Sequence, residues 1–149
     1  MKRFHLHLSV TDLEQNIRFY STLFGQAPNV VKPDYAKWML DDPKVNFAIS
    51  TFSERVGIDH LGFQADDAEV LDQLRSAYEA ADRSSVVHEE NAACCYAVSN
   101  KHWVTDPQGL AWEAFQSLNQ VPTFHGEHKK PVTIAVKSAA ACCGPGPSC

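Results

Sequence analysis

The sequence predicts an α+β protein made of two βαβββ modules, whose eight strands together line a concave cleft. Three observations favour this fold class: strands in which apolar and polar residues alternate, helices with apolar residues at helical spacing, and a repeat of the whole pattern. The chain has 149 residues. That length suits one ordinary domain, or two small halves that share a core.

The first module is predicted to span residues 1–52. It opens with FHLHLSV, residues 4–10, where strict alternation of apolar and polar side chains indicates a strand with two different faces. Asp12 offers a helix N-cap, and apolar residues then recur at helical spacing as far as Gly25, which is expected to end the helix. YAKWML and VNFAIST, on either side of a DDPK turn, are expected to pair as a hairpin. The predicted order is therefore β-α-β-β-β.

The second module, residues 56–119, repeats the first. IDHLGFQADD aligns with RFHLHLSVTD, and the alignment places His60 on His5 and Asp67 on Asp12. A helix is expected over DAEVLDQLRSAYEAA, and the strands after it over SSVVHEE, CCYAVS, KHWVTDPQG and LAWEAFQ. This internal repeat predicts two similar units related by pseudo-twofold symmetry within one domain over residues 1–121.

Residues 122–149 are polar at first and then rich in small residues, Gly and Pro, so they are predicted to form a flexible tail. The chain has five cysteines, an odd number, and none precedes Cys94. A disulfide framework is therefore not expected. For the tail cysteines, a role in metalloid capture or thiol relay and no role at all both remain open; these are Cys142, Cys143 and Cys149.

The composition is that of a soluble globular protein, with 44% hydrophobic and 21% charged residues. The net charge of −5 is spread along the chain, so no nucleic-acid surface is indicated. No apolar run approaches the roughly 18 residues that a membrane span needs, and the first residues do not form a signal peptide. We expect a cytoplasmic protein with reduced thiols, and neither a nucleic-acid nor a membrane partner.

Three residues form the candidate metal site. His5 and His60 open the first strands of their modules, so pseudo-symmetry brings both imidazoles to equivalent places on the inner wall of the cleft. Glu113 lies in the last strand, and its neighbours Trp112 and Ala114 point to the other face. A carboxylate on the inner face is costly unless something pairs with it. Two histidines and one carboxylate are the ligand set of non-haem Fe(II) sites, which Ni, Co or Zn can also occupy.

The other candidate ligands are weaker. The equivalent strand of module one, VNFAIST, offers no obvious ligand, so a metal would keep open positions for dioxygen and substrate. A single histidine at the start of a strand is more often a surface or core residue, and only the symmetry of the pair favours ligation. His7 shares a face with His5 but is matched by Gly62 in the repeat, so a supporting or structural role is expected. Surface positions are expected for His88, His102, His125 and His128.

The pattern H-L-x-L-x-V-x-D-L-x-x-x-I-x-F-Y-x-x-L-F-G, followed by I-D-H-L-G-F and D-P-x-G-x-x-W-E, resembles the vicinal oxygen chelate superfamily over residues 3–117. That superfamily includes glyoxalase I, bleomycin-resistance proteins and extradiol dioxygenases, and is built from paired βαβββ modules. The resemblance places the metal ligands on His5, His60 and Glu113. The segment ACCYAVSNKHWVTDPQGLAWEAF is similar to the organoarsenical carbon–arsenic bond lyases and the related cadmium-induced proteins.

This closer resemblance implies that Cys94 and Cys95 bind trivalent arsenic on a mobile loop, and that Fe(II) and dioxygen cleave the carbon–arsenic bond. The residues are consistent with it, because trivalent organoarsenicals are soft electrophiles that exchange two oxygen ligands for two thiolates. Adjacent side chains of a strand point to opposite faces, so two adjacent thiols can converge only where the backbone bends. The alternative is that both cysteines are small buried hydrophobic residues.

The expected function is therefore that of an Fe(II)-dependent dioxygenase that releases arsenite from a methyl or aryl arsenical. Lys101 and Tyr96 either orient an oxygen intermediate or stabilise a thiolate, or are ordinary loop residues. One alternative is a protein that sequesters cadmium or arsenite without turnover. Another is a different metalloenzyme of the same superfamily, of the glyoxalase or dioxygenase type. The sequence leaves open whether the chain forms a homodimer.

Overall fold

The structure is a computed structural model, and it describes residues 1–120. The predicted tail, with Cys142, Cys143 and Cys149, lies outside the described residues. The elements in chain order are β1 (Lys2–Ser9), α1 (Leu13–Phe24), β2 (Val30–Lys32), β3 (Tyr35–Asp41), β4 (Lys44–Ser50), β5 (Gly57–Ala65), α2 (Ala68–Asp82), β6 (Val87–Cys94), β7 (Ala97–Thr105) and β8 (Ala111–Gln120).

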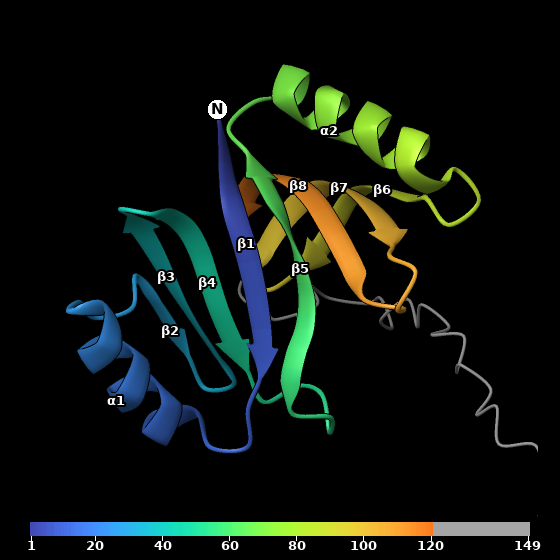
Figure 1. Ribbon diagram of the computed structural model, residues 1–149. Coiled ribbons are helices and arrows are strands. Elements are labelled where there is room, and N and C mark those ends of the chain that lie inside the picture. Colours follow the sequence, from blue (N-terminus) through green and yellow to red (C-terminus); the bar gives the residue numbers. More distant parts are fainter. Residues whose placement is uncertain (121–149) are drawn as a thin grey trace, which may run out of the picture.

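The strands form one eight-stranded sheet in the order β2-β3-β4-β1-β5-β8-β7-β6. Within each module the first strand pairs in parallel with the last one, β1 with β4 and β5 with β8. The two modules meet where β1 and β5 pair in antiparallel orientation. This arrangement confirms the predicted fold class, two βαβββ modules that share one curled sheet (Figure 1).

Both helices begin as the sequence predicts. The carboxylate of Asp12 accepts a hydrogen bond from the backbone N–H of Gln15, and Asp67 does the same for Val70. The first helix ends at Gly25, whose φ of 67° is the left-handed conformation that glycine adopts without strain. Figure 1 shows α1 and α2 on the outer side of the sheet, one beside each module.

The apolar core lies between the sheet and these helices. In module one, Trp38 and Ile49 are fully buried and pack in one cluster with Phe47 and the inner side of α1. In module two, Leu71 and Leu74 of α2 pack in one cluster with the outward-facing residues of the sheet. Because successive residues of a strand point to opposite faces, this outer apolar layer leaves the alternate residues for the concave face.

Two details differ from the expectation. The second strand of module one is the short β2, which pairs with β3 and which the sequence pattern did not delimit. CCYAVS and KHWVTD were expected as separate strands, but residues 97–105 form the single strand β7. It is joined to β6 by a two-residue turn, Cys95–Tyr96, with φ angles of 56° and 62°. This turn conformation normally calls for Gly or Asn, so its sequence gave no turn signal.

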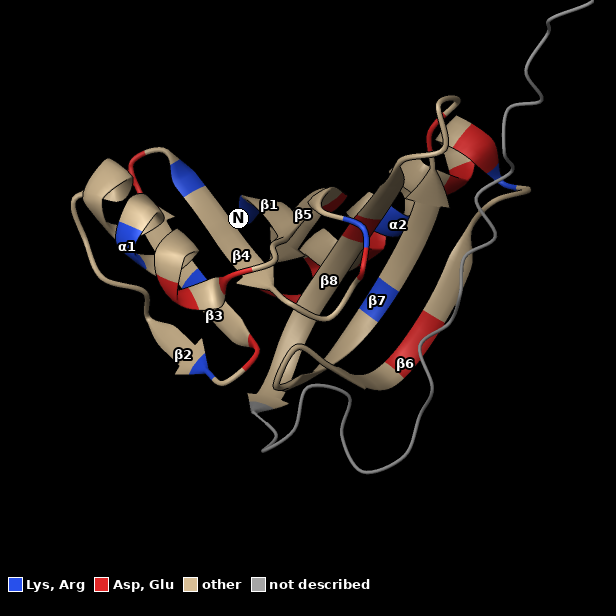
Figure 2. Cartoon of the chain, turned by 90° about the horizontal axis from the view of Figure 1, so that it is seen from below, with Lys and Arg blue, Asp and Glu red and all other residues tan. Residues whose placement is uncertain are grey.

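The concave face carries the polar side chains of the interior. Among residues 1–120, nine polar or charged side chains are buried, and strand alternation places all of them on this face: His5, His7, Ser9, Asn46, Ser50, His60, Ser99, Lys101 and Glu113. Figure 2 shows the two ends of the sheet, with α1 and α2, on either side of the central β1 and β5. The described part of the chain contains no helix long and apolar enough to span a membrane.

Candidate metal centre and thiol pair

The two predicted histidines meet at the junction of the modules. His5 on β1 and His60 on β5 are both buried, and their Nε2 atoms lie 3.1 Å apart. The other ring nitrogen of each is held by a neighbour: His5 Nδ1 donates to the carbonyl oxygen of Asn46 at 3.0 Å, and His60 Nδ1 donates to Asp59 Oδ1 at 2.7 Å. In the neutral imidazoles these partners hold the proton on Nδ1, so each Nε2 lone pair is available to a metal.

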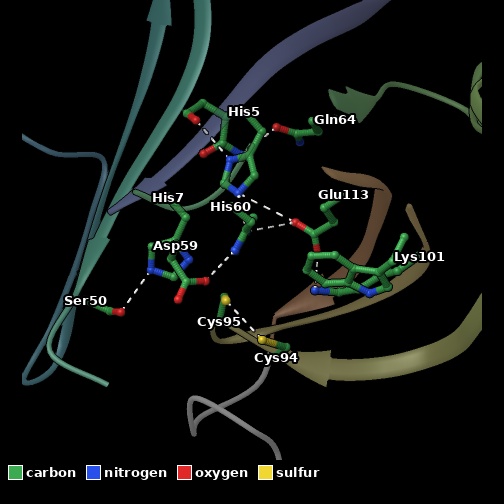
Figure 3. A network of polar contacts seen from close by, with 12 residues as sticks. His5, His7, Ser50, Asp59, His60, Gln64, Cys94, Cys95, Lys101 and Glu113 are labelled. Carbon is green, nitrogen blue, oxygen red and sulfur yellow. Dashed lines mark hydrogen bonds and ion pairs between the residues drawn. The ribbon is translucent and has the colours of Figure 1, made fainter. Parts of the chain in front are cut away.

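Glu113 completes the group from β8. Its Oε2 lies 3.6 Å from His5 Nε2 and 3.4 Å from His60 Nε2, so three donor atoms converge on one point (Figure 3). The other oxygen, Oε1, accepts a hydrogen bond from Lys101 Nζ at 2.6 Å. Lys101 and Glu113 are both buried, so this is an ion pair shielded from water. Lys101 therefore fixes one carboxylate oxygen and leaves the other for the convergence point.

The charges of this group are strongly coupled. Burial, and next the charge of His60, lower the pKa of His5 to about 4. Burial also tends to lower the pKa of His60, but its contacts with Asp59 and Glu113 raise it to about 9. Burial by itself would raise the pKa of Glu113, yet Lys101 and His60 hold it well below its usual range. At neutral pH His60 is therefore the protonated, positively charged imidazole of the metal-free group, His5 is neutral and Glu113 is ionised.

The donor set fits a divalent metal ion. Two ligands with bonds of about 2.1 Å and at right angles to each other are about 3.0 Å apart, and at a tetrahedral angle about 3.4 Å. The observed separations of 3.1, 3.4 and 3.6 Å are close to this range. A metal ion bound at this point would take the place of the proton that His60 otherwise carries beside Glu113. His5, His60 and Glu113 are thus the residues that would hold a metal.

A second, overlapping donor set includes His7. One ring nitrogen from each of His5, His7 and His60 lies within 4.8 Å of the other two, and all three residues are buried. We place Glu113 ahead of His7 as the third donor, because its Oε2 lies within 3.6 Å of both Nε2 atoms and a carboxylate supplies the negative charge that a divalent cation favours. The described residues hold no other such cluster.

The predicted thiol pair lies at the tip of the β6–β7 hairpin. Cys94 is the last residue of β6, Cys95 is the first residue of the turn, and their Sγ atoms are 3.0 Å apart. The bend expected between adjacent thiols is thus supplied by the positive φ of Cys95. A hydrogen bond from Cys95 lowers the pKa of Cys94 to about 7 against the effect of burial, with help from Lys101. The same hydrogen bond and burial raise the pKa of Cys95 well above its usual value.

The hairpin tip closes over the concave face of module one. Cys94, Cys95 and Tyr96 pack against Tyr35 and Ala48. The Tyr96 hydroxyl donates a hydrogen bond to Asp34, between β2 and β3, and the ammonium of Lys32 lies 5.3 Å from the centre of the Tyr96 ring. In Figure 3 the two sulfurs lie on the same side of the sheet as His60 and His7.

Several residues of the site escaped the sequence reasoning. Asp59 directly precedes His60, and a carboxylate beside a candidate ligand was a signal that could have been used. Asn46 acts through its backbone carbonyl, which no side-chain pattern reveals. Asp34 lies far from Tyr96 in the sequence, and only the folded sheet brings the two together.

The comparisons with known proteins agree with this geometry. Residues 2–114 match the model of the glyoxalase/bleomycin resistance protein/dioxygenase superfamily, and the chain belongs to that superfamily. It is 37% identical to the "trivalent organoarsenical cleaving enzyme" of Bacillus sp. (strain MD1), over 97% of this chain and 92% of that protein. It is 32% identical to the "cadmium-induced protein CadI" of Mycobacterium bovis, over 96% and 93% of the two chains.

Solved structures share the fold. The 2,3-dioxygenase LapB from Pseudomonas sp. KL28 superposes with a TM-score of 0.58 at 19% identity, covering 80% of this chain and 42% of that one. Identity at this level concerns the fold alone. Together the fold and the relatives indicate an enzyme, and its buried histidines could hold a metal ion.

Proposed function

We propose that this protein cleaves the carbon–arsenic bond of trivalent organoarsenicals, methyl or aryl, and releases arsenite in a reaction that uses Fe(II) and dioxygen. One observation carries the proposal: a hard N, N, O donor set and a pair of soft thiols lie on the same concave face. The relatives named organoarsenical cleaving enzymes support the same substrate class.

The thiols are the substrate site in this proposal. A trivalent arsenical with two hydroxyl groups forms two As–S bonds with Cys94 and Cys95, and both hydroxyls leave as water with the two thiol protons. Cys94 begins this exchange, because its lowered pKa supplies a thiolate near neutral pH. The carbon substituent is the one arsenic ligand that remains, and the hairpin holds it over the concave face.

His5, His60 and Glu113 hold the metal in this proposal. Fe(II) bound there supplies open coordination positions and redox chemistry towards dioxygen. Lys101 keeps Glu113 oriented through Oε1 and sits close enough to the thiols to favour their ionised forms. Tyr96 keeps the hairpin closed through Asp34, or orients an oxygen species from the hairpin tip. For a methyl substituent, one methylarsonous acid and one dioxygen balance one formaldehyde and one arsenous acid.

A cytoplasmic location suits this reaction, because the thiols must stay reduced to bind arsenic. All the proposed ligands and thiols come from one chain, so a homodimer is not required to complete the site.

The test is arsenite release by the full-length protein reconstituted with Fe(II), given methylarsonous acid in air and sampled by chromatography with elemental detection. Wild type is expected to release arsenite and consume oxygen. Cys94→Ser is expected to lose most of this activity while it retains bound iron. Glu113→Ala and His60→Gln are expected to lose both iron and activity. His102→Gln is the matched control, because His102 faces α2 on the other side of the sheet.

Two results would contradict the proposal: no arsenite from the iron-loaded wild type, or undiminished release by Cys94→Ser. Stoichiometric loss of free arsenite or cadmium without oxygen consumption would favour the alternative function, sequestration by the thiols without turnover. That alternative draws on the cadmium-induced relatives.

A further inference from the structure

Within residues 1–120, His7 is the one buried histidine on the concave face that the proposed function does not use. It lies on β1, two residues after His5 and therefore on the same face, and only 4% of its surface is exposed. The antiparallel pairing of β1 with β5 puts His7 directly opposite His60. The two rings meet edge to face, with their centres 4.8 Å apart.

One nitrogen of His7 has a partner and the other has none. Nε2 lies 2.9 Å from Ser50 Oγ, which is itself buried. Nδ1 is buried and has no hydrogen-bond partner among residues 1–120. A buried polar atom left without a partner costs about 1–3 kcal/mol, so such an atom calls for an explanation.

The three histidines share one pattern of contacts. In each ring, one nitrogen is held by a neighbour: His5 by the carbonyl of Asn46, His60 by Asp59 and His7 by Ser50. One nitrogen from each ring lies within 4.8 Å of the other two, and the nitrogen of His7 that has no partner is Nδ1. In Figure 3, Ser50 lies on the far side of the His7 ring from His60. Histidines that bind metals are held in this way, by a partner on the nitrogen that does not bind.

We propose that His7 is an additional protein ligand of the metal centre, bound through Nδ1 and oriented by Ser50. This inference rests on the proposed metal site of His5, His60 and Glu113. Two donors on opposite sides of an ion, each with a bond of about 2.1 Å, are about 4.2 Å apart. The three histidine nitrogens lie within 4.8 Å of one another, so the His7 ring needs only a small shift to reach the same ion. The resting site then has three imidazoles and one carboxylate, and fewer open positions than the triad alone.

The test uses Co(II) bound to the full-length protein, with no substrate and no activity assay. Paramagnetically shifted, exchangeable imidazole N–H signals in the proton NMR spectrum count the histidines on Co(II). Wild type is expected to show three such signals. His7→Phe, which keeps a ring but removes both nitrogens, is expected to show two, with affinity for Co(II) at least tenfold lower in competition with a chelator.

Further variants separate the possible failures. Ser50→Ala keeps the His7 ring and is expected to retain the third signal with weaker Co(II) binding. His7→Gln repeats the measurement should His7→Phe fail to fold, and it is expected to show two signals. The inference is overturned if either His7 variant binds Co(II) with the affinity and the signals of wild type. If His5→Ala also leaves Co(II) binding unchanged, the proposed triad fails as well, which is a different result.

Discussion

At the scale of single residues, one buried lysine influences the charges of both parts of the site, the N and O donors around Glu113 and the two thiols. Lys101 Nζ is hydrogen-bonded to Glu113 Oε1, and its positive charge also helps to lower the pKa of Cys94. Burial tends to lower the pKa of Lys101, but Glu113 and the two thiols raise it above its ordinary value. Lys101 therefore stays charged, and its charge acts on both Glu113 and Cys94.

The first prediction concerns the ionisation of Cys94. Because the hydrogen bond from Cys95 and the charge of Lys101 lower its pKa to about 7, about half of Cys94 is expected to be thiolate at neutral pH. Alkylation by iodoacetamide, followed by peptide mass spectrometry from about pH 5 to about pH 10, should give a midpoint near 7 for this thiol. In Cys95→Ala the midpoint should move up towards the ordinary value, since the largest cause of the shift is removed. An ordinary midpoint in wild type would contradict this prediction.

The second prediction concerns the ion pair of Lys101 and Glu113. Lys101→Met leaves a buried carboxylate without its ammonium partner, and breaking such a pair costs about 3–5 kcal/mol. The free energy of unfolding, measured in urea with a chelator present, is expected to fall by about 3 kcal/mol. With Co(II) bound the loss should be smaller, because the cation then compensates Glu113. Equal stability of the metal-free variant and wild type would show that the pair contributes little.

At the scale of elements, the β6–β7 hairpin decides whether the thiols face the proposed metal site. Its tip turns at Cys95 and Tyr96, two residues with positive φ and no glycine, and such strained positions often mark functional segments. The tip is attached to module one through Tyr96 and Asp34 and through packing on Tyr35. The hairpin of module two thus reaches across to module one, on the face that carries the proposed metal ligands.

The third prediction tests this attachment. Tyr96→Phe keeps the ring and its packing but removes the hydroxyl that donates to Asp34, a bond worth about 1–2 kcal/mol after screening by solvent. A bulky disulfide reagent is expected to reach Cys94 and Cys95 several-fold faster in this variant than in wild type. Asp34→Asn, which retains an acceptor oxygen, is the matched control and should show a smaller effect. Unchanged thiol accessibility in Tyr96→Phe would mean that packing alone keeps the hairpin closed.

At the scale of the whole molecule, the proposed metal site lies on the seam between the two modules. His5 comes from module one, and His60 and Glu113 come from module two, so the separation of β1, β5 and β8 sets the distances between the ligands. Gly62 of β5 lies beside Glu113 of β8, and a Cβ at Gly62 would lie 1.8 Å from the Glu113 carbonyl oxygen. Only glycine permits this approach of the two strands.

The fourth prediction follows from this close contact. Gly62→Ala must push the backbone of β8 away and displace Glu113, since the obstructing atom is backbone and cannot rotate aside. We expect at least a tenfold loss of Co(II) affinity, measured by chelator competition, and a lower melting temperature. Gly25→Ala is the control: it adds a Cβ in open space at the end of α1, so it should cost about 1 kcal/mol of stability and leave Co(II) affinity unchanged. Normal Co(II) binding by Gly62→Ala would contradict the role of the seam.

Much of this structure could be predicted from the sequence because it depends on local patterns and on the repeat. Alternation and helical spacing predicted the long elements, and the alignment of the two halves predicted that His5 and His60 would meet. Glu113 could be assigned to the inner face because strand residues alternate. The Cys95–Tyr96 turn could not be predicted, because its backbone conformation is imposed on residues that do not favour it.

The sequence by itself determined the fold class, the two symmetric histidines and the carboxylate that joins them. The environment of His7 was decided by the tertiary structure alone. In the repeat His7 is matched by Gly62, which suggested that it had no counterpart in the site. The alignment of the repeat and the pairing of the strands match different residues, because β1 and β5 run antiparallel. In the folded sheet His5 therefore lies opposite Gly62, and His7 lies opposite His60.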